Sequence, residues 1–134
     1  MNELALDAVG GRTVAEVMMT RPKVLSAEAT VDDARAVFAN PKVQTCPMLD
    51  ASGVLVAELS REQLPDSAAG GDPARGYAEA APETIAPGAP MQQALDRLHA
   101  LGDERLCVVD GDGRLQGLLC LNGRHNAFCT DKPS

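Results

Sequence analysis

The feature that most constrains the fold of this 134-residue chain is an internal repeat with a period of 60 residues. When Asp50 is aligned with Asp110, no gap is needed in either direction, and apolar positions also match, such as Phe38 with Leu98. Such self-similarity indicates one folding unit encoded twice. Further identical pairs include Pro22 with Pro82, Ala29 with Ala89, Ala34 with Ala94, Gly53 with Gly113, Leu55 with Leu115 and Leu59 with Leu119.

Each half predicts the element order helix–strand–helix–strand–strand–helix. Two main helices are predicted where apolar residues recur at helical spacing, at Val31, Ala34, Val37 and Phe38 and again at Met91, Ala94, Leu95, Leu98 and Leu101. Thr30 with Asp33 predicts a capped start for the first of these helices, and Pro90 suits the first turn of the second. Short apolar runs on either side of a glycine-containing turn predict a hairpin after each helix, and a short helical turn closes each half.

This pattern predicts an α/β (α+β) fold of two βαββα repeats, packed sheet to sheet with pseudo-twofold symmetry. A small sheet with helices on one face cannot bury both of its surfaces alone, which explains why the unit is duplicated. The predicted boundaries are an N-terminal extension (1–12), a first repeat (13–64), a linker (65–72), a second repeat (73–128) and a loose tail (129–134).

Composition excludes several classes of function. The net charge of −7 and the pI of about 4.7 argue against a nucleic-acid partner, because an acidic surface repels phosphate backbones. Neither a signal peptide nor a membrane segment is recognisable. The four cysteines form no CxxC pair, so we expect reduced thiols and a cytoplasmic location. Frequent Ala, Gly and Arg with few Lys suggests a bacterial source.

The ordered landmarks of the first half are 17–22, 30–34, 47–50 and 53–60, and the series returns from Tyr77 to about Phe128. In this order and spacing they resemble a CBS domain, and the two halves together resemble a tandem CBS pair, or Bateman module. The resemblance implies a compact disc whose two clefts between the halves bind an adenosine-type ligand (AMP, ADP, ATP or S-adenosylmethionine). It also implies a homodimer that regulates a partner protein in trans and is not an enzyme.

In the family the ribose is held by a Gly-x-x-Thr/Ser-x-x-Asp signature, where a carboxylate accepts hydrogen bonds from both ribose hydroxyls. The first copy here has Ser60 at the hydroxyl position but Gln63 at the position of the aspartate. The second copy keeps Gly117 but has Cys120 and Gly123 at the other two positions. Loss of a charge-assisted bond costs about 1.5–3 kcal/mol. Gln63 still offers one carbonyl acceptor, so the resemblance favours the cleft around the first copy.

Further ligand-binding positions follow from the resemblance. Thr20 and Arg21 precede the first strand, where a cleft is expected, and Arg61 and Arg124 stand near the starts of the closing helices, where free N–H groups favour phosphate. On the buried strands the positions are Cys46, Met48, Leu106 and Val108.

Structural alternatives stand beside several of these assignments. Ser60 and Gln63 also form an S-x-x-Q capping box that needs no ligand, and basic residues at helix starts are often simply solvated. His125 and Cys129 have the i,i+4 spacing of a metal pair on a helix, with Cys120 as the nearest third ligand, although accidental spacing is the better explanation.

Three hypotheses for function therefore remain: a regulatory module that binds an adenosine-type ligand, an interaction scaffold with vestigial clefts, and a small thiol- or metal-dependent enzyme. The third is disfavoured because the sequence holds only two histidines, no nucleophile elbow and no phosphate-binding glycine loop. No metal and no resident cofactor are expected.

Overall fold

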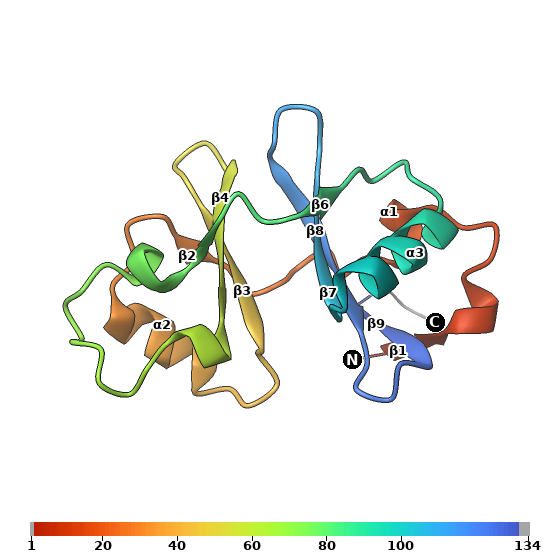
Figure 1. The fold of residues 1–134 in the computed structure, drawn as a ribbon. Coiled ribbons are helices and arrows are strands. Elements are labelled where there is room, and N and C mark those ends of the chain that lie inside the picture. The colour runs from red at the N-terminus through yellow and green to blue at the C-terminus, as the bar shows by residue number, and fades with distance from the viewer. Residues whose placement is uncertain (1, 132–134) are drawn as a thin grey trace. The chain divides into compact units, whose positions relative to one another are not determined.

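The computed structural model describes residues 2–131 and contains two β-sheets with few helices, which confirms the mixed α/β fold class (Figure 1). The chain packs as two compact units. We call Lys23–Pro82 the central unit, and the residues up to Pro22 together with those from Glu83 onward the terminal unit. Among the described residues, every helix is too short or too polar to span a lipid bilayer.

The central unit is a four-stranded mixed sheet in the order β2-β3-β4-β5. β2 runs parallel to β3, and the other neighbours are antiparallel. Helix α2 buries Ala34 and Phe38 against Cys46, Met48 and Leu59 of the sheet. The elements are β2 (Leu25–Ser26), α2 (Val31–Phe38), β3 (Thr45–Leu49), β4 (Leu55–Ser60), the 3-10 turns η2 (Arg61–Gln63) and η3 (Ala74–Tyr77), and β5 (Glu79–Ala80).

The terminal unit is a five-stranded mixed sheet in the order β1-β9-β8-β7-β6. β6 runs parallel to β7, and the remaining neighbours are antiparallel. Helix α3 buries Met91, Ala94 and Leu98 in one core with Leu106 and Phe128. The elements are β1 (Asn2–Ala5), the 3-10 turn η1 (Leu6–Ala8), α1 (Val14–Val17), β6 (Thr84–Ile85), α3 (Met91–Leu101), β7 (Arg105–Val109), β8 (Leu115–Leu121) and β9 (Ala127–Thr130).

The predicted 60-residue repeat is confirmed by the two central hairpins, β3–β4 and β7–β8. In each turn an aspartate side chain, Asp50 or Asp110, accepts two backbone N–H groups from the residues that follow. Gly53 and Gly113 take φ values of 84° and 82° at the same place, a left-handed conformation that favours glycine. A shift in register near the end of β3 also recurs near the end of β7.

The first main helix begins as predicted after Thr30, whereas Pro90 precedes α3 and does not lie in its first turn. At α2 the Thr30 hydroxyl accepts the Asp33 N–H at 3.3 Å, and the Asp33 carboxylate accepts the Thr30 N–H at 2.9 Å. At α3 the residue before the first turn is Pro90, which supplies no side-chain cap. Only the first helix therefore has the reciprocal capping box that satisfies two otherwise free N–H groups.

The segment that opens each repeat packs on the sheet of the other repeat. Met19 exchanges two backbone hydrogen bonds with Leu118 of β8, at 2.8 and 3.0 Å. Sixty residues later, Glu79 of β5 stands opposite Glu58 of β4 in an antiparallel pair. Gly117 permits the first contact, because a Cβ there would lie 2.5 Å from the Met19 carbonyl oxygen. The compact units thus divide the chain at 22/23 and 82/83, whereas the predicted starts of the repeats, at 13 and 73, remain predictions.

The predicted linker, 65–72, is instead a packed loop of the central unit. The Arg35 guanidinium donates to the Ala68 carbonyl at 2.7 Å, and the Asp32 N–H in the first turn of α2 donates to the Gly70 carbonyl at 3.0 Å. Because the first N–H groups of a helix have no partner within the helix, this loop supplies one of them with an acceptor.

The prediction of a closing helix in the second repeat is wrong. β8 continues to Leu121, and the chain then turns back as β9 (Figure 1). The Asn122 side chain accepts the Asn126 N–H at 3.0 Å, and His125 takes a φ of 57°, so the segment forms a tight turn in place of a helix. The first repeat closes with the short turn that was predicted, here the 3-10 turn η2, and Pro65 follows it.

Both predicted end segments belong to the sheet of the terminal unit. In the predicted extension 1–12, β1 pairs with β9, which places Leu4 opposite Phe128. The prediction of a loose tail from Cys129 is wrong for residues 129–131, because Cys129 lies in β9 and Asp131 is hydrogen-bonded. Residues 132–134 of that tail lie outside the described part of the chain.

Candidate functional site

The first copy of the ribose signature lies at the end of β4 in the central unit. Ser60 stands opposite Thr45, the first residue of β3. Ser60 and Gln63 form the predicted capping box, in which the Gln63 Oε1 accepts the Ser60 N–H at 2.8 Å. The carbonyl oxygen predicted to accept a ribose hydroxyl is therefore engaged within the turn. Within residues 2–131 the Gln63 Nε2 has no hydrogen-bond partner, so this side chain can donate to a ligand.

Arg61 was predicted to meet a phosphate, and in the structure its guanidinium makes structural contacts at the edge of a hollow of about 300 Å³. Its Nη2 donates to the carbonyl oxygens of Asn40, at 2.9 Å, and Val43, at 2.6 Å. The guanidinium also lies over the Phe38 ring, 5.2 Å from its centroid. These contacts fix the chain that follows α2 to the start of η2.

The predicted ligand-lining residues on the strands have their side chains in the two cores. Cys46 and Met48 face α2, while Leu106 and Val108 belong to the core that contains α3, and none is more than 1% exposed. The Cys46 thiol donates to the Lys23 carbonyl at 3.3 Å, and burial raises its pKa to about 12. The structure thus uses these four side chains for packing, which leaves only their backbone for a ligand.

The second copy of the signature is divided between a buried strand and an exposed turn. Cys120 is buried in β8, whereas Gly123 and Arg124 lie in the exposed turn between β8 and β9. A Cβ at Gly123 would meet nothing within 4 Å. The helical spacing proposed for His125 and Cys129 is absent, because this segment is a hairpin. In the described part of the chain, no three His, Cys, Asp or Glu side chains gather as metal ligands.

Thr20 and Arg21 meet an acceptor that the sequence did not predict. The Asp131 carboxylate accepts the Thr20 N–H at 2.8 Å, the Arg21 N–H at 2.8 Å and the Thr20 hydroxyl at 3.1 Å. Although partial desolvation raises the pKa of Asp131, the hydrogen bonds from Thr20 and Arg21 outweigh it and lower that pKa below its ordinary value. The available signal was Asn122-Gly123 between two apolar runs, which favours a hairpin and would have returned the tail to the sheet.

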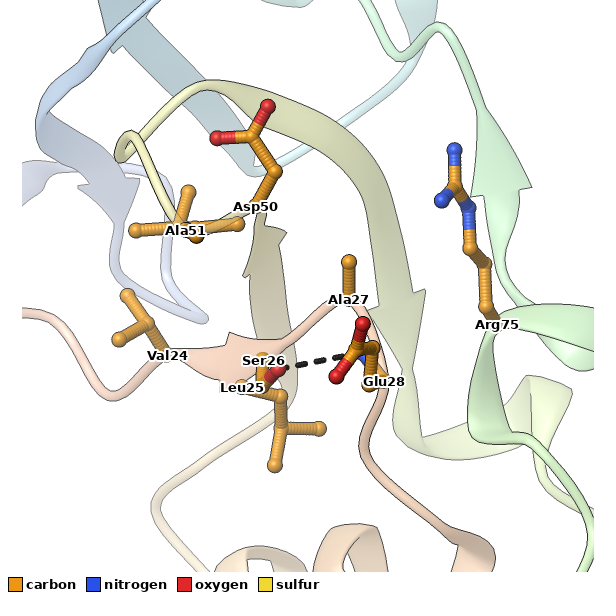
Figure 2. Close-up of a pocket in the computed structure, with 9 residues that line it drawn as sticks. Val24, Leu25, Ser26, Ala27, Glu28, Asp50, Ala51 and Arg75 are labelled. Carbon is orange, nitrogen blue, oxygen red and sulfur yellow. Dashed lines mark hydrogen bonds between the residues drawn. The ribbon is translucent and has the colours of Figure 1, made fainter.

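Each unit has a hollow at the equivalent place, and in the central unit the hollow lies at the opposite end of β3 from Ser60. In the central unit a hollow of about 510 Å³ opens where β2 and β3 end, beside Leu25 and Asp50 (Figure 2). In the terminal unit a hollow of about 390 Å³ opens beside Ile85 and Asp110, the residues 60 positions later. None of the predicted ligand residues lines either hollow.

The rim of the central hollow carries charges of both signs. Figure 2 shows Arg75 of η3 separated from the carboxylates of Glu28 and Asp50, and no ion pair joins them. The Ser26 hydroxyl accepts the Glu28 N–H at 3.1 Å, which fixes the turn after β2. The Asp50 carboxylate is partly used by its own hairpin turn. The hollow therefore offers weakly organised polar groups and no catalytic set.

Two mixed sheets, each accompanied by a helix and built from one repeated sequence, define a duplicated α/β module. Residues 75–122 match the model of the CBS domain family. The comparison with curated proteins gives no match. The matched residues run from η3 of the central unit to the end of β8 in the terminal unit.

The fold is similar to that of solved CBS proteins. A structure of CBSX2 in complex with AMP has a TM-score of 0.74 and 26% identity, covering 82% of this chain and 90% of that chain. A structure of CBSX2 from Arabidopsis thaliana has a TM-score of 0.71 and 26% identity, covering 81% of this chain and 87% of that chain. The structure of PAE2072 from Pyrobaculum aerophilum complexed with AMP has a TM-score of 0.71 and 20% identity, covering 81% of this chain and 86% of that chain. The family match and these structures thus confirm the predicted resemblance to a tandem CBS domain pair.

Proposed function

We propose that this chain is a non-enzymatic regulatory module that binds an adenosine-type ligand (AMP, ADP, ATP or S-adenosylmethionine) and acts on a partner protein in trans. The observation that carries the proposal is the similarity, at 26% identity over 82% of the chain, to a CBSX2 structure in complex with AMP. Proteins of this family are generally regulatory modules, which supports a binding role over a catalytic one.

We place the ligand's ribose at the junction of β4 and η2. Ser60 supplies the hydroxyl of the family signature there, and the unpartnered Gln63 Nε2 can donate to a ribose oxygen. The second copy offers no comparable pair, because Gly123 has no side chain and Cys120 is buried. In the terminal unit, moreover, the Thr20 and Arg21 amides are already satisfied by Asp131. These contrasts favour the site in the central unit.

The test is a calorimetric titration of the whole chain with AMP, ATP and S-adenosylmethionine. We expect binding by the natural protein, and binding that is about ten- to hundredfold tighter in Gln63→Asp, because the restored carboxylate regains a charge-assisted bond of about 1.5–3 kcal/mol. Aspartate also keeps the capping box, since Asp33 fills the same role at α2. Gly123→Asp is the matched control, and we expect it to leave affinity unchanged.

The main alternative is an interaction scaffold whose clefts are vestigial. It is favoured by one observation, namely that the Gln63 carbonyl is engaged by the Ser60 N–H. No heat and no thermal shift with any of the three ligands at millimolar concentration, in both the natural chain and Gln63→Asp, would establish the scaffold. Ligand at a hundred times its Kd should add about 2.7 kcal/mol of stability.

We also propose that the chain forms a homodimer, as family modules do. Light scattering after size-exclusion chromatography tests this assembly: twice the mass of the 14.0 kDa chain supports the dimer, and a monomer at all concentrations contradicts it.

A further inference from the structure

Two of the four cysteines face each other across the last hairpin. Cys120 of β8 and Cys129 of β9 are directly opposite in the antiparallel register. Residues in that position have Cα atoms about 4.5–5.5 Å apart, which falls within the range that a disulfide spans, about 4.4–6.8 Å. Neither cysteine is in a disulfide. The register therefore places the two residues at a backbone separation that a disulfide can span.

The other two cysteines do not share this arrangement. Cys46 lies in the core of the central unit, where its thiol donates to the Lys23 carbonyl. Cys107 of β7 is fully buried and stands opposite Leu118. In the cross-strand registers of the described residues, no further cysteine stands opposite another.

The surroundings of the two cysteines indicate which thiol reacts first with an oxidant and which one then attacks the mixed disulfide. Cys129 is partly exposed, whereas Cys120 is only 9% exposed. A small oxidant therefore meets Cys129 first. Burial raises the pKa of Cys120 to about 11, and Arg105, directly opposite on β7, acts against that rise because its positive charge favours the thiolate. The raised pKa slows attack by Cys120, so Cys120 acts in the second step, where the mixed disulfide on Cys129 stands directly opposite it.

We propose that Cys120 and Cys129 form a reversible intramolecular disulfide when the protein meets a low-molecular-weight disulfide such as oxidised glutathione. The Cys129 thiolate attacks one sulfur of the oxidant, which forms a mixed disulfide and releases one glutathione thiolate. Cys120 gives its proton to water and attacks the Cys129 sulfur, which releases the second glutathione thiolate. Two protein thiols are oxidised and one oxidant disulfide is reduced to two thiols.

The disulfide would link β9, the strand that distinguishes the terminal unit from the central unit, to β8. β9 lies between β8 and β1 and is followed at once by Asp131, which holds Thr20 and Arg21. A disulfide restricts the unfolded chain and stabilises the folded hairpin that it closes. The oxidised protein should therefore unfold at a higher temperature than the reduced protein and exchange the amide hydrogens of Thr20 and Arg21 more slowly.

The experiment equilibrates the full chain with mixtures of reduced and oxidised glutathione, blocks the remaining thiols with a maleimide and maps the peptides by mass spectrometry. We expect a linked peptide pair containing Cys120 and Cys129, loss of two of the four thiols, and reversal by dithiothreitol. Cys129→Ser and Cys120→Ser should each abolish the linked pair. The matched controls Cys46→Ser and Cys107→Ser should retain it.

Three results would overturn the proposal. One is the absence of the linked pair at every glutathione ratio in the natural chain. Another is a mixed disulfide on Cys129 that Cys120 never resolves. The third is a linked pair that appears only after denaturation, or with Cys46 and Cys107 in equal amounts, since random pairing needs no native register. Circular dichroism of each serine variant shows whether it is folded, and the natural chain tests the proposal even where a variant does not fold.

Discussion

The two units carry the same hairpin but leave it differently. In the central unit, β4 ends at Ser60 and enters a 3-10 turn, with Pro65 soon after. In the terminal unit, β8 runs to Leu121 and the chain returns as β9. The difference resides in a few residues, because Ser60 with Gln63 caps a helical turn whereas Asn122 with the turn after it closes a hairpin. The repeated sequence therefore determines the hairpin, whereas the residues directly after its second strand determine the path of the chain from there.

The different exits also place different chemistry beside the opening segment of the other repeat. The central exit offers the Ser60 hydroxyl and the Gln63 amide. The terminal exit has Cys120 and Gly123 at the hydroxyl and aspartate positions of the signature, and the Asp131 carboxylate after its returning strand accepts the N–H groups of Thr20 and Arg21. Two successive backbone N–H groups directed at one carboxylate form a small anion-binding nest. In the terminal unit the backbone N–H groups of Thr20 and Arg21 are thus satisfied by a carboxylate of the same chain.

The largest expected effect tests whether β9 is part of the core of the terminal unit. Phe128→Ala should cost about 3–5 kcal/mol of unfolding free energy, because the ring is 0% exposed and its loss leaves a cavity. Urea denaturation measures it. Leu101→Ala, at a side chain that is 43% exposed, is the control and should change stability by no more than about 0.5 kcal/mol. Equal effects of the two variants would mean that β9 is not packed as described.

A smaller effect is expected where the repeats differ by one methyl group. Gly117→Ala should cost about 1–3 kcal/mol, because the new Cβ would meet the Met19 carbonyl oxygen and the Met18 sulfur. At the equivalent position of the central unit stands Ala57, and Ala57→Gly should cost about 0.5–1 kcal/mol through backbone entropy. Urea denaturation gives both values, and hydrogen exchange at Met19 should rise only in the first variant.

The outcome that contradicts this expectation is a neutral Gly117→Ala with unchanged protection of the Met19 amide. The opening segment would then have room to shift on β8, and the close approach would not be required.

The two helix starts should differ by about 1 kcal/mol. Thr30→Ala removes a cap from α2 and should destabilise the protein by that amount. Pro90→Ala removes no side-chain cap from α3 and should be close to neutral. Thermal denaturation monitored by circular dichroism compares them, and a larger loss for Pro90→Ala would reverse the comparison.

The smallest effect is a pH dependence that belongs to one unit. Since hydrogen bonds lower the pKa of Asp131 in the folded state, its contribution is fully present above the ordinary value of 3.8 and is lost as the pH falls through the lower folded pKa. Asp131→Asn should therefore be slightly less stable than the natural chain at pH 7, and the gap should close in acid. Denaturation series at pH 7 and below pH 4 measure it, and a gap that widens in acid would contradict the assignment.

The structural features that both repeats share could be predicted from the sequence. The features that occur in only one repeat could not. The sheets and the main helices followed from apolar spacing and capping residues. The second closing helix was expected because the first half has a closing turn, although Asn122-Gly123 favours a hairpin. The side chains of Cys46 and Met48 were assigned to a ligand from the family pattern, but which face of a strand meets the helix is decided by register. The Asp131 contact joins residues 111 positions apart, beyond any local pattern.

The exchange of opening segments makes the halves interdependent. A fragment that contains one repeat alone would keep its hairpin but lack the opening segment of the other repeat, which pairs with that hairpin. Its own opening segment would in turn have no strand to pair with. Such a fragment can restore both pairings only by exchanging opening segments with a second copy of itself. The duplication therefore makes intramolecular a strand exchange that single repeats would have to make between two chains.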